Sequence, residues 1–211
     1  MRYTASHKQE THQRLLNVAA EALREKGPER LAVADVMRAA GLTHGGFYAH
    51  FKSKDALLAE TLAAGFAQSA RRMRRLVDGL PPRHALATWI DQYVSPHHRD
   101  NRSTGCPIVA LSSDLPRQSK KFQAAFDKGV KAMIRQLESW MAESGMDEPE
   151  RLAESVLSAA VGAVSMSRAV SDKRLSDDLL EAARANIKAR LALGDAALSN
   201  EAQDQKGGRV S

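Results

Sequence analysis

The seven prolines of the chain lie between segments in which apolar residues recur every three or four positions. Proline lacks the amide hydrogen that a helix interior requires, so this placement is typical of helices separated by short connections. Sustained alternation of apolar and polar residues, which marks half-buried strands, does not occur in the sequence. We therefore predict an all-α chain of about nine helices. The clearest apolar stripe consists of Phe122, Phe126, Val130, Met133, Leu137, Trp140 and Met141.

Helices are expected near residues 6–26, 33–40, 44–50, 53–77, 83–95, 106–113, 117–144, 148–171 and 175–194. The polar segment 195–211 is expected to be disordered. No apolar run reaches the roughly 18 residues that a membrane span needs. The N-terminus lacks the apolar core of a signal peptide, and a single cysteine excludes an internal disulfide, so we expect a cytoplasmic protein.

Most of the excess positive charge lies in the N-terminal part of the chain. The net charge is +6, and residues 1–80 hold 13 basic and 8 acidic residues, which accounts for +5 of it. This asymmetry favours an anionic partner such as nucleic acid, although a solvated basic surface explains it equally well. Arg71, Arg72, Arg74 and Arg75 lie about 27 Å beyond Ser53 on one predicted helix, a distance that favours a solvated face over a phosphate-binding role.

Residues 31–51 carry the pattern of a helix-turn-helix motif. A first short helix, with Val33, Val36, Met37 and Ala40 facing inward, is expected to stop at Gly41. Glycine accepts the left-handed conformation that ends many helices. Two short helices joined through such a turn are typical of DNA-binding proteins whose second helix enters the major groove. The alternative is a helical hairpin that only completes a core.

The second helix of the motif is expected to have an inner and an outer face. Thr43 is placed to cap its first turn, and Phe47 and Phe51, one turn apart, are expected to face inward. Its two glycines each lower helix stability by about 1 kcal/mol relative to alanine, which indicates a close approach of the backbone to another surface. Ser53 is expected to cap the next helix, where Lys54 in the first turn is placed to meet a phosphate. The residues left on the outer faces are His44, Gly45, Tyr48 and His50.

The stretch AAGLTHGGFYAHFKSKDAL, residues 39–57, resembles the signature of TetR/AcrR-type transcriptional regulators. The resemblance implies a homodimer that binds operator DNA, usually as a repressor, and releases it when a small molecule fills the C-terminal domain. We accordingly predict a DNA-binding domain at residues 1–55, with the motif at about 31–51, and a ligand-binding and dimerisation domain at residues 56–194. The alternative function is a helical small-molecule-binding protein whose helix-turn-helix no longer reads DNA.

The resemblance also assigns roles by position. Ala32 stands where the family commonly has a threonine that caps the first helix of the motif and contacts phosphate, so that contact is in doubt. Gly46 stands where a threonine is frequent, so base readout there falls to the backbone, and we expect His44 and Arg38 to carry more of the discrimination. The implied phosphate contacts are Thr43, Tyr48, His50 and Lys54. The residues implied to approach base edges are His44 and Gly45.

The last two predicted helices are candidates for a subunit interface. The helix at 148–171 is rich in alanine, glycine and serine, and small side chains allow helices to approach closely. The stripe from Leu175 to Leu191 could supply the other half of a four-helix interface. Packing within one subunit explains both patterns equally well, and the resemblance favours a homodimer through residues 150–193.

Aromatic and methionine residues of the second domain indicate the character of its ligand. At helical spacing such residues are more often core than pocket, but as a group they suggest a largely apolar cavity and an apolar small-molecule effector. The candidate lining residues are Trp89, Tyr93, Cys106, Phe126 and Met166.

Cys106 precedes Pro107 at an expected helix start, a position that favours a reactive thiolate. Cys106 is therefore either a sensor of oxidants or electrophiles, or a small buried structural residue. His97 and His98 are adjacent and lack the spacing of metal ligands. Because no catalytic motif is present, we expect no enzyme activity, no metal and no cofactor.

Overall fold

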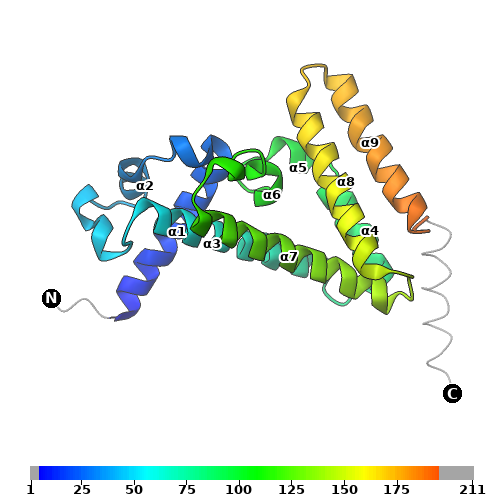
Figure 1. Ribbon diagram of the computed structural model, residues 1–211, viewed down its shortest axis with the longest axis horizontal. Coiled ribbons are helices and arrows are strands. Elements are labelled where there is room, and N and C mark those ends of the chain that lie inside the picture. Colours follow the sequence, from blue (N-terminus) through cyan, green and yellow to red (C-terminus); the bar gives the residue numbers. More distant parts are fainter. Residues whose placement is uncertain (1–4, 195–211) are drawn as a thin grey trace. The chain divides into compact units, whose positions relative to one another are not determined.

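In the computed structural model, which describes residues 5–194, short connections separate a series of helices (Figure 1). No strand occurs among these residues, so the all-α prediction is confirmed. The predicted segment 195–211 lies outside the described residues. The elements are α1 (Ala5–Arg30), α2 (Val33–Ala39), η1 (His44–Ala49), α3 (Lys54–Val77), α4 (Pro82–Tyr93), α5 (Pro96–Asp100), α6 (Pro107–Leu111), η2 (Leu115–Arg117), α7 (Lys120–Glu143), α8 (Pro149–Ala169) and α9 (Lys173–Arg190).

Two short elements were not predicted, namely α5 and the 3-10 helix η2. They contain five and three residues, too few to show an apolar period in the sequence. The kink in α1 explains another difference. Gly27 has φ 77° and ψ 170°, a conformation that favours glycine, and Pro28 begins the additional turn that extends the helix beyond the predicted end at residue 26.

The described chain forms two compact units. Residues up to 72 and residues 101–132 make the first unit, and residues 73–100 together with those from 133 onward make the second. The first unit thus extends beyond the predicted DNA-binding domain of residues 1–55. Within it, α6 contacts α1, and α3 meets α7 through the rings of Phe66 and Phe126, which lie 6.1 Å apart in an edge-on arrangement.

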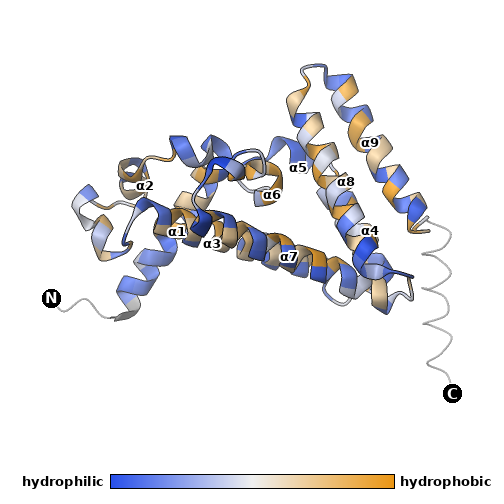
Figure 2. Cartoon of the chain, viewed as in Figure 1, coloured by the Kyte–Doolittle hydropathy of each residue, from blue (hydrophilic) through white to orange (hydrophobic). Residues whose placement is uncertain are grey.

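The core of the first unit lies beneath α2 and η1. Its members come from α1, α2, η1, α3, α6, η2 and α7 and from the connections between them, and Figure 2 shows hydrophobic and hydrophilic residues mixed along the longest of these helices. That mixture is expected of helices that bury one face. Within residues 5–194, no helix is long and apolar enough to cross a membrane. The largest fully buried side chains of this core are Leu15, Leu23, Leu31, Met37, Leu57, Leu62, Leu111 and Phe122.

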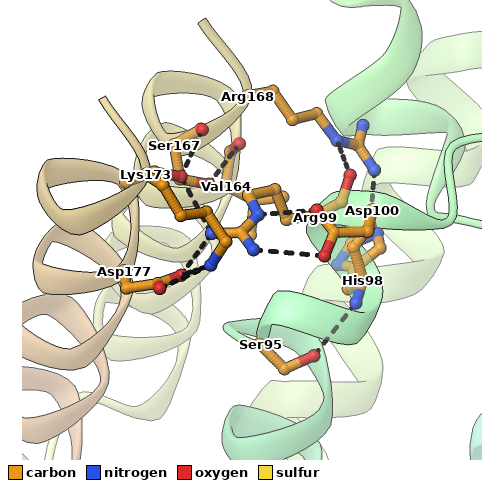
Figure 3. Close-up of polar contacts among 10 residues, drawn as sticks. Ser95, His98, Arg99, Asp100, Val164, Ser167, Arg168, Lys173 and Asp177 are labelled. Carbon is orange, nitrogen blue, oxygen red and sulfur yellow. Dashed lines mark hydrogen bonds and ion pairs between the residues drawn. The ribbon is translucent and has the colours of Figure 1, made fainter. Parts of the chain in front are cut away.

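In the second unit, a buried arginine fastens α5 to the hairpin of α8 and α9 (Figure 3). Arg99 is only 5% exposed, and its guanidinium donates to Asp100, Ser176 and Asp177 at 2.7, 2.9 and 2.5 Å. Arg168 of α8 donates in turn to the main-chain oxygens of His98 and Arg99. The bonds to Asp100 and Asp177 raise the pKa of Arg99 above its ordinary value, so the buried group stays charged.

Gly129 of α7 offers a test of packing in the first unit. A Cβ at this position would overlap the ring of Phe66, so we expect Gly129→Ala to lower the free energy of unfolding by about 1–3 kcal/mol in chemical denaturation. The matched control is Lys128→Ala, because Lys128 is the exposed neighbour on the same helix. A Gly129→Ala protein as stable as Lys128→Ala would contradict the packing described here.

Candidate nucleic-acid interface

The turn between α2 and η1 is built as the sequence predicts. Gly41 has φ 73°, and its amide donates to the carbonyl of Arg38 at 2.9 Å. The next amide, that of Leu42, donates to the carbonyl of Met37 at 2.9 Å. These bonds satisfy carbonyls that the end of α2 would otherwise leave unpaired. The prediction that the first helix of the motif stops at Gly41 is therefore confirmed.

The second helix of the motif is a six-residue 3-10 helix, and its start differs from the prediction. Thr43 occupies the N-cap position, but its side chain makes no capping hydrogen bond. Instead, the main-chain oxygen of Thr43 accepts from the amide of Gly46 at 3.1 Å, as the tighter 3-10 winding allows. The predicted side-chain cap is thus wrong, and the Thr43 side chain lies exposed.

Two phenylalanines attach η1 to the core, as predicted. Phe47 and Phe51 are 4% and 2% exposed, and their ring centroids lie 5.6 Å apart. Tyr48 points the other way and is 77% exposed, although one edge of its ring meets Phe47. A large aromatic side chain left in solvent beside a well-packed core is available for a contact outside the chain.

The two glycines of η1 have different surroundings. A Cβ at Gly45 would meet no atom within 4 Å, and Gly45 is exposed. A Cβ at Gly46 would lie 3.5 Å from the terminal methyl of Met37, which is ordinary contact. Packing inside the chain therefore does not require glycine at position 45. This fits the predicted close approach of the η1 backbone to another surface.

The basic side chains around η1 are exposed. Ser53 caps α3 as predicted, because its hydroxyl accepts from the amide of Ala56 at 3.1 Å. Lys54, in the first turn of α3, is exposed, and its ammonium group lies 3.5 Å from the main-chain oxygen of Glu29. Arg38 is 78% exposed and pairs with Asp35 one turn earlier on α2 at 3.2 Å. An exposed pair of this kind contributes little stability and leaves the guanidinium open to an anionic partner.

His50 follows η1 and is only half exposed, in contrast to His44 and Tyr48. Burial lowers the pKa of His50 below its ordinary value, and the neighbouring His12 and Lys8 lower it further. The imidazole is therefore neutral near pH 7. His12 had no local signal in the sequence, because it reaches this site only through the packing of α1.

The candidate pocket residues fall into both units. Trp89 and Tyr93 of the second unit are buried and stacked, with centroids 4.6 Å apart. Cys106 and Phe126 belong to the first unit. Met166, in the second unit, is 56% exposed on α8, whereas Trp89, Tyr93 and Cys106 are buried, and its place in a ligand pocket stays a prediction. Its helical position matches a core stripe, and only tertiary packing shows that it faces outward.

Cys106 is 5% exposed at the start of α6. The nearby guanidinium of Arg24 is also buried, and its Nε donates to the main-chain oxygen of Ser103. Burial of the thiol fits the structural reading, and the sensor reading stays a prediction. Among residues 5–194, no group of three or more histidine, cysteine, aspartate or glutamate side chains is arranged to hold a metal ion.

Comparisons with known proteins match both halves of the chain. Residues 15–61 match the family model described as "Bacterial regulatory proteins, tetR family". Residues 82–185 match the model "Transcriptional regulator LmrA/YxaF-like, C-terminal domain". A curated relative, the HTH-type transcriptional repressor NemR of Escherichia coli K12, is 24% identical over 140 residues, which cover 65% of this chain and 70% of NemR. The regulator AcrR of Shigella flexneri is 37% identical over 59 residues, which cover 28% of this chain and 27% of AcrR.

Solved structures share the fold. The reduced form of Escherichia coli NemR superimposes with a TM-score of 0.74 at 22% identity, covering 85% of this chain and 95% of that one. A TetR-family transcriptional regulator from Cytophaga hutchinsonii gives a TM-score of 0.75 at 16% identity, covering 88% and 97%.

The environment of His50 predicts its titration. In the folded protein, we expect the His50 resonances to titrate below 6.5 in NMR spectra. Because the unfolded chain takes up this proton first, the contribution of His50 to stability is complete above that pH and is lost as the pH falls. In His12→Gln, the pKa of His50 should move part of the way back, since burial remains the larger cause. Titration of wild-type His50 at or above 6.5 would contradict the described burial.

Proposed function

The chain belongs to the TetR/AcrR family of transcriptional regulators, a family of non-enzymatic DNA-binding proteins, and on that premise we propose that residues 31–51 occupy the major groove of operator DNA. The observation that carries this placement is the outer face of η1. It combines an exposed tyrosine with a glycine that no internal packing requires, directly above two buried phenylalanines. Such a face can approach the duplex closely while its inner side stays fixed to the core.

Within this proposal, the exposed side chains have distinct roles. His44 and the backbone at Gly45 and Gly46 approach base edges, and Arg38 adds to the discrimination between bases. Phosphate contacts fix the register of the protein on the duplex, and base contacts specify the sequence. The proposed phosphate contacts are Thr43, Tyr48, His50 and Lys54.

A helical small-molecule-binding protein that no longer reads DNA is the second candidate. The observation in its favour is Ala32, which stands at the N-cap of α2 and makes no side-chain capping bond. A threonine there would offer both a cap and a phosphate contact. The exposed outer face of η1 has no evident use in such a protein, and for that reason we favour the DNA-binding function.

We further propose that the outer faces of α8 and α9 form the homodimer interface, within residues 150–193. The two helices lie side by side, joined by a short turn (Figure 1). On α8, Ala159, Gly162 and Met166 are exposed at helical spacing, and on α9 the exposed residues Leu175 and Ala182 share one face. Small and apolar side chains exposed on a helix pair suit a four-helix interface between two subunits.

The effector in this proposal is a largely apolar small molecule that binds within residues 56–194 and releases the operator. Buried aromatic side chains such as Trp89 and Tyr93 support an apolar ligand. We propose that the protein acts as a repressor in the cytoplasm, as the repressor names among its relatives suggest.

The DNA-binding face is tested with a duplex selected from a random pool by the wild-type protein. We expect Tyr48→Ala to weaken binding about ten- to a hundredfold, because a charge-assisted contact to phosphate contributes about 1.5–3 kcal/mol. Gly45→Ala should also weaken binding without loss of stability, since its Cβ has free space in the chain but would meet the DNA. Affinity is measured by fluorescence anisotropy over a series of salt concentrations, and it should fall steeply with salt.

Lys128→Ala, an exposed position on α7 outside the motif, serves as the matched control and should bind like the wild type. Full affinity in both Tyr48→Ala and Gly45→Ala would contradict the proposed face. Failure of the wild type to select any duplex would favour the second candidate function.

The dimer interface is tested by charge. Gly162→Glu places a carboxylate in the middle of the proposed apolar face, where burial without a partner is costly, so we expect monomers in sedimentation velocity. Ala185→Glu is the matched control, because Ala185 lies on the exposed side of α9 that carries Arg174, Asp178 and Glu181. A Gly162→Glu protein that remains dimeric at micromolar concentration would exclude this face.

A further inference from the structure

His12 of α1, which is bonded to Glu60 of α3, lies next to His50. Nε2 of His12 is 3.0 Å from a carboxylate oxygen of Glu60. The His12 ring packs on Phe51, with centroids 4.7 Å apart, and its centroid is 6.0 Å from that of His50. His12 and Glu60 lie outside the helix-turn-helix motif, so a role in the motif does not account for their contact.

The bond between His12 and Glu60 fixes one ring. A carboxylate can only accept, so Nε2 of His12 carries the hydrogen and donates it. This bond, together with the contact with Phe51, holds the His12 ring in one orientation beside His50. Because the side chains of His12 and Glu60 are 29% and 46% exposed, the bond adds little to overall stability, and its consequence is orientation.

The two ring nitrogens of His50 have different surroundings. Nδ1 is buried and has no hydrogen-bond partner among the described residues. Nε2 is not among the buried atoms without a partner, so it is the nitrogen of this half-exposed ring that an outside acceptor can reach. The groups that face His50 are Lys8 and His12 of α1, and Glu60 of α3 reaches it through His12. Burial, and then the neighbouring His12 and Lys8 of α1, oppose a second proton on His50, so one hydrogen remains, and on Nε2 it can be donated outward.

We propose that His12 and Glu60 are positioning residues for His50, holding its ring with Nδ1 inward and the Nε2 hydrogen directed at a DNA phosphate. This inference rests on the proposed function, because it takes His50 as a phosphate contact. In addition, it proposes that the orientation of the His50 donor is set by two residues outside the helix-turn-helix motif. These residues, His12 and Glu60, lie 48 positions apart in the sequence.

A double-mutant cycle in the full chain tests the proposal, with the same selected duplex as probe. We expect His12→Ala and Glu60→Ala each to weaken binding about two- to tenfold, the range of one hydrogen bond. His50→Ala should weaken binding at least as much. Neither His12→Ala nor Glu60→Ala should cause a further loss in the His50→Ala background, because both act only through His50.

Two features keep the test independent of folding. Glu60 is half exposed, so its truncation leaves the core intact, and unfolding curves verify this for each variant. Gln13→Ala is the matched control, since Gln13 is the exposed neighbour of His12 on α1 and should leave affinity unchanged. Imidazole nitrogen NMR supplies a readout without DNA, in which wild-type His50 should carry its hydrogen on Nε2 and Glu60→Ala should show a mixture of both forms.

The possible outcomes distinguish the positioning role of His12 and Glu60 from the DNA-binding role of the η1 face. If His50→Ala weakens binding but Glu60→Ala does not, or does so equally in the His50→Ala background, the positioning role is overturned and the proposed DNA-binding face stands. If His50→Ala and Tyr48→Ala both retain full affinity, the proposed DNA-binding face itself fails. An unchanged His50 nitrogen spectrum in both Glu60→Ala and His12→Ala would also overturn the positioning role.

Discussion

The burial of Phe47 and Phe51 is the interaction on which the DNA-binding motif depends. A six-residue 3-10 helix with two glycines has too few hydrogen bonds and too much backbone freedom to be stable alone. Its inner side is fixed because both rings enter the core formed by α1, α2 and α3. Once that side is fixed, the outer side can remain bare. An exposed tyrosine and an open glycine are then available to a partner, at no cost to the packing underneath.

Charge has a smaller part in this face than the net charge of +6 suggests. Arg38 and Lys54 are exposed, and their contacts with Asp35 and with a main-chain oxygen leave them open to an anionic partner. His50 is kept neutral by its burial and its neighbours. In the proposed function, the face uses shape and neutral hydrogen-bond donors in addition to the attraction of Arg38 and Lys54 to phosphates. The chain belongs to a family of transcriptional regulators, and the contact of this face with DNA is our proposal.

Polar contacts organise the second unit in a comparable way. Arg99 is buried at the end of a five-residue helix, and its bonds to Ser176 and Asp177 attach that helix to the start of α9 (Figure 3). Arg168 completes the connection from α8 through two main-chain oxygens. A guanidinium can serve several acceptors at once, which suits a junction of three helices. The hairpin that we propose as the subunit interface is thereby held to α5.

The sequence by itself determined the longer helices, the turn at Gly41, the cap at Ser53 and the inward direction of Phe47 and Phe51. Each follows from local rules, namely the apolar period, the conformational freedom of glycine and the capping of free amides. Tertiary structure decided the 3-10 form of η1, the exposure of Met166, the short helix α5 and the pairing of His12 with Glu60. These features depend on residues far apart in the chain. They are stabilised by contacts between side chains that are distant in the sequence, and a local sequence pattern does not predict which distant side chains come together.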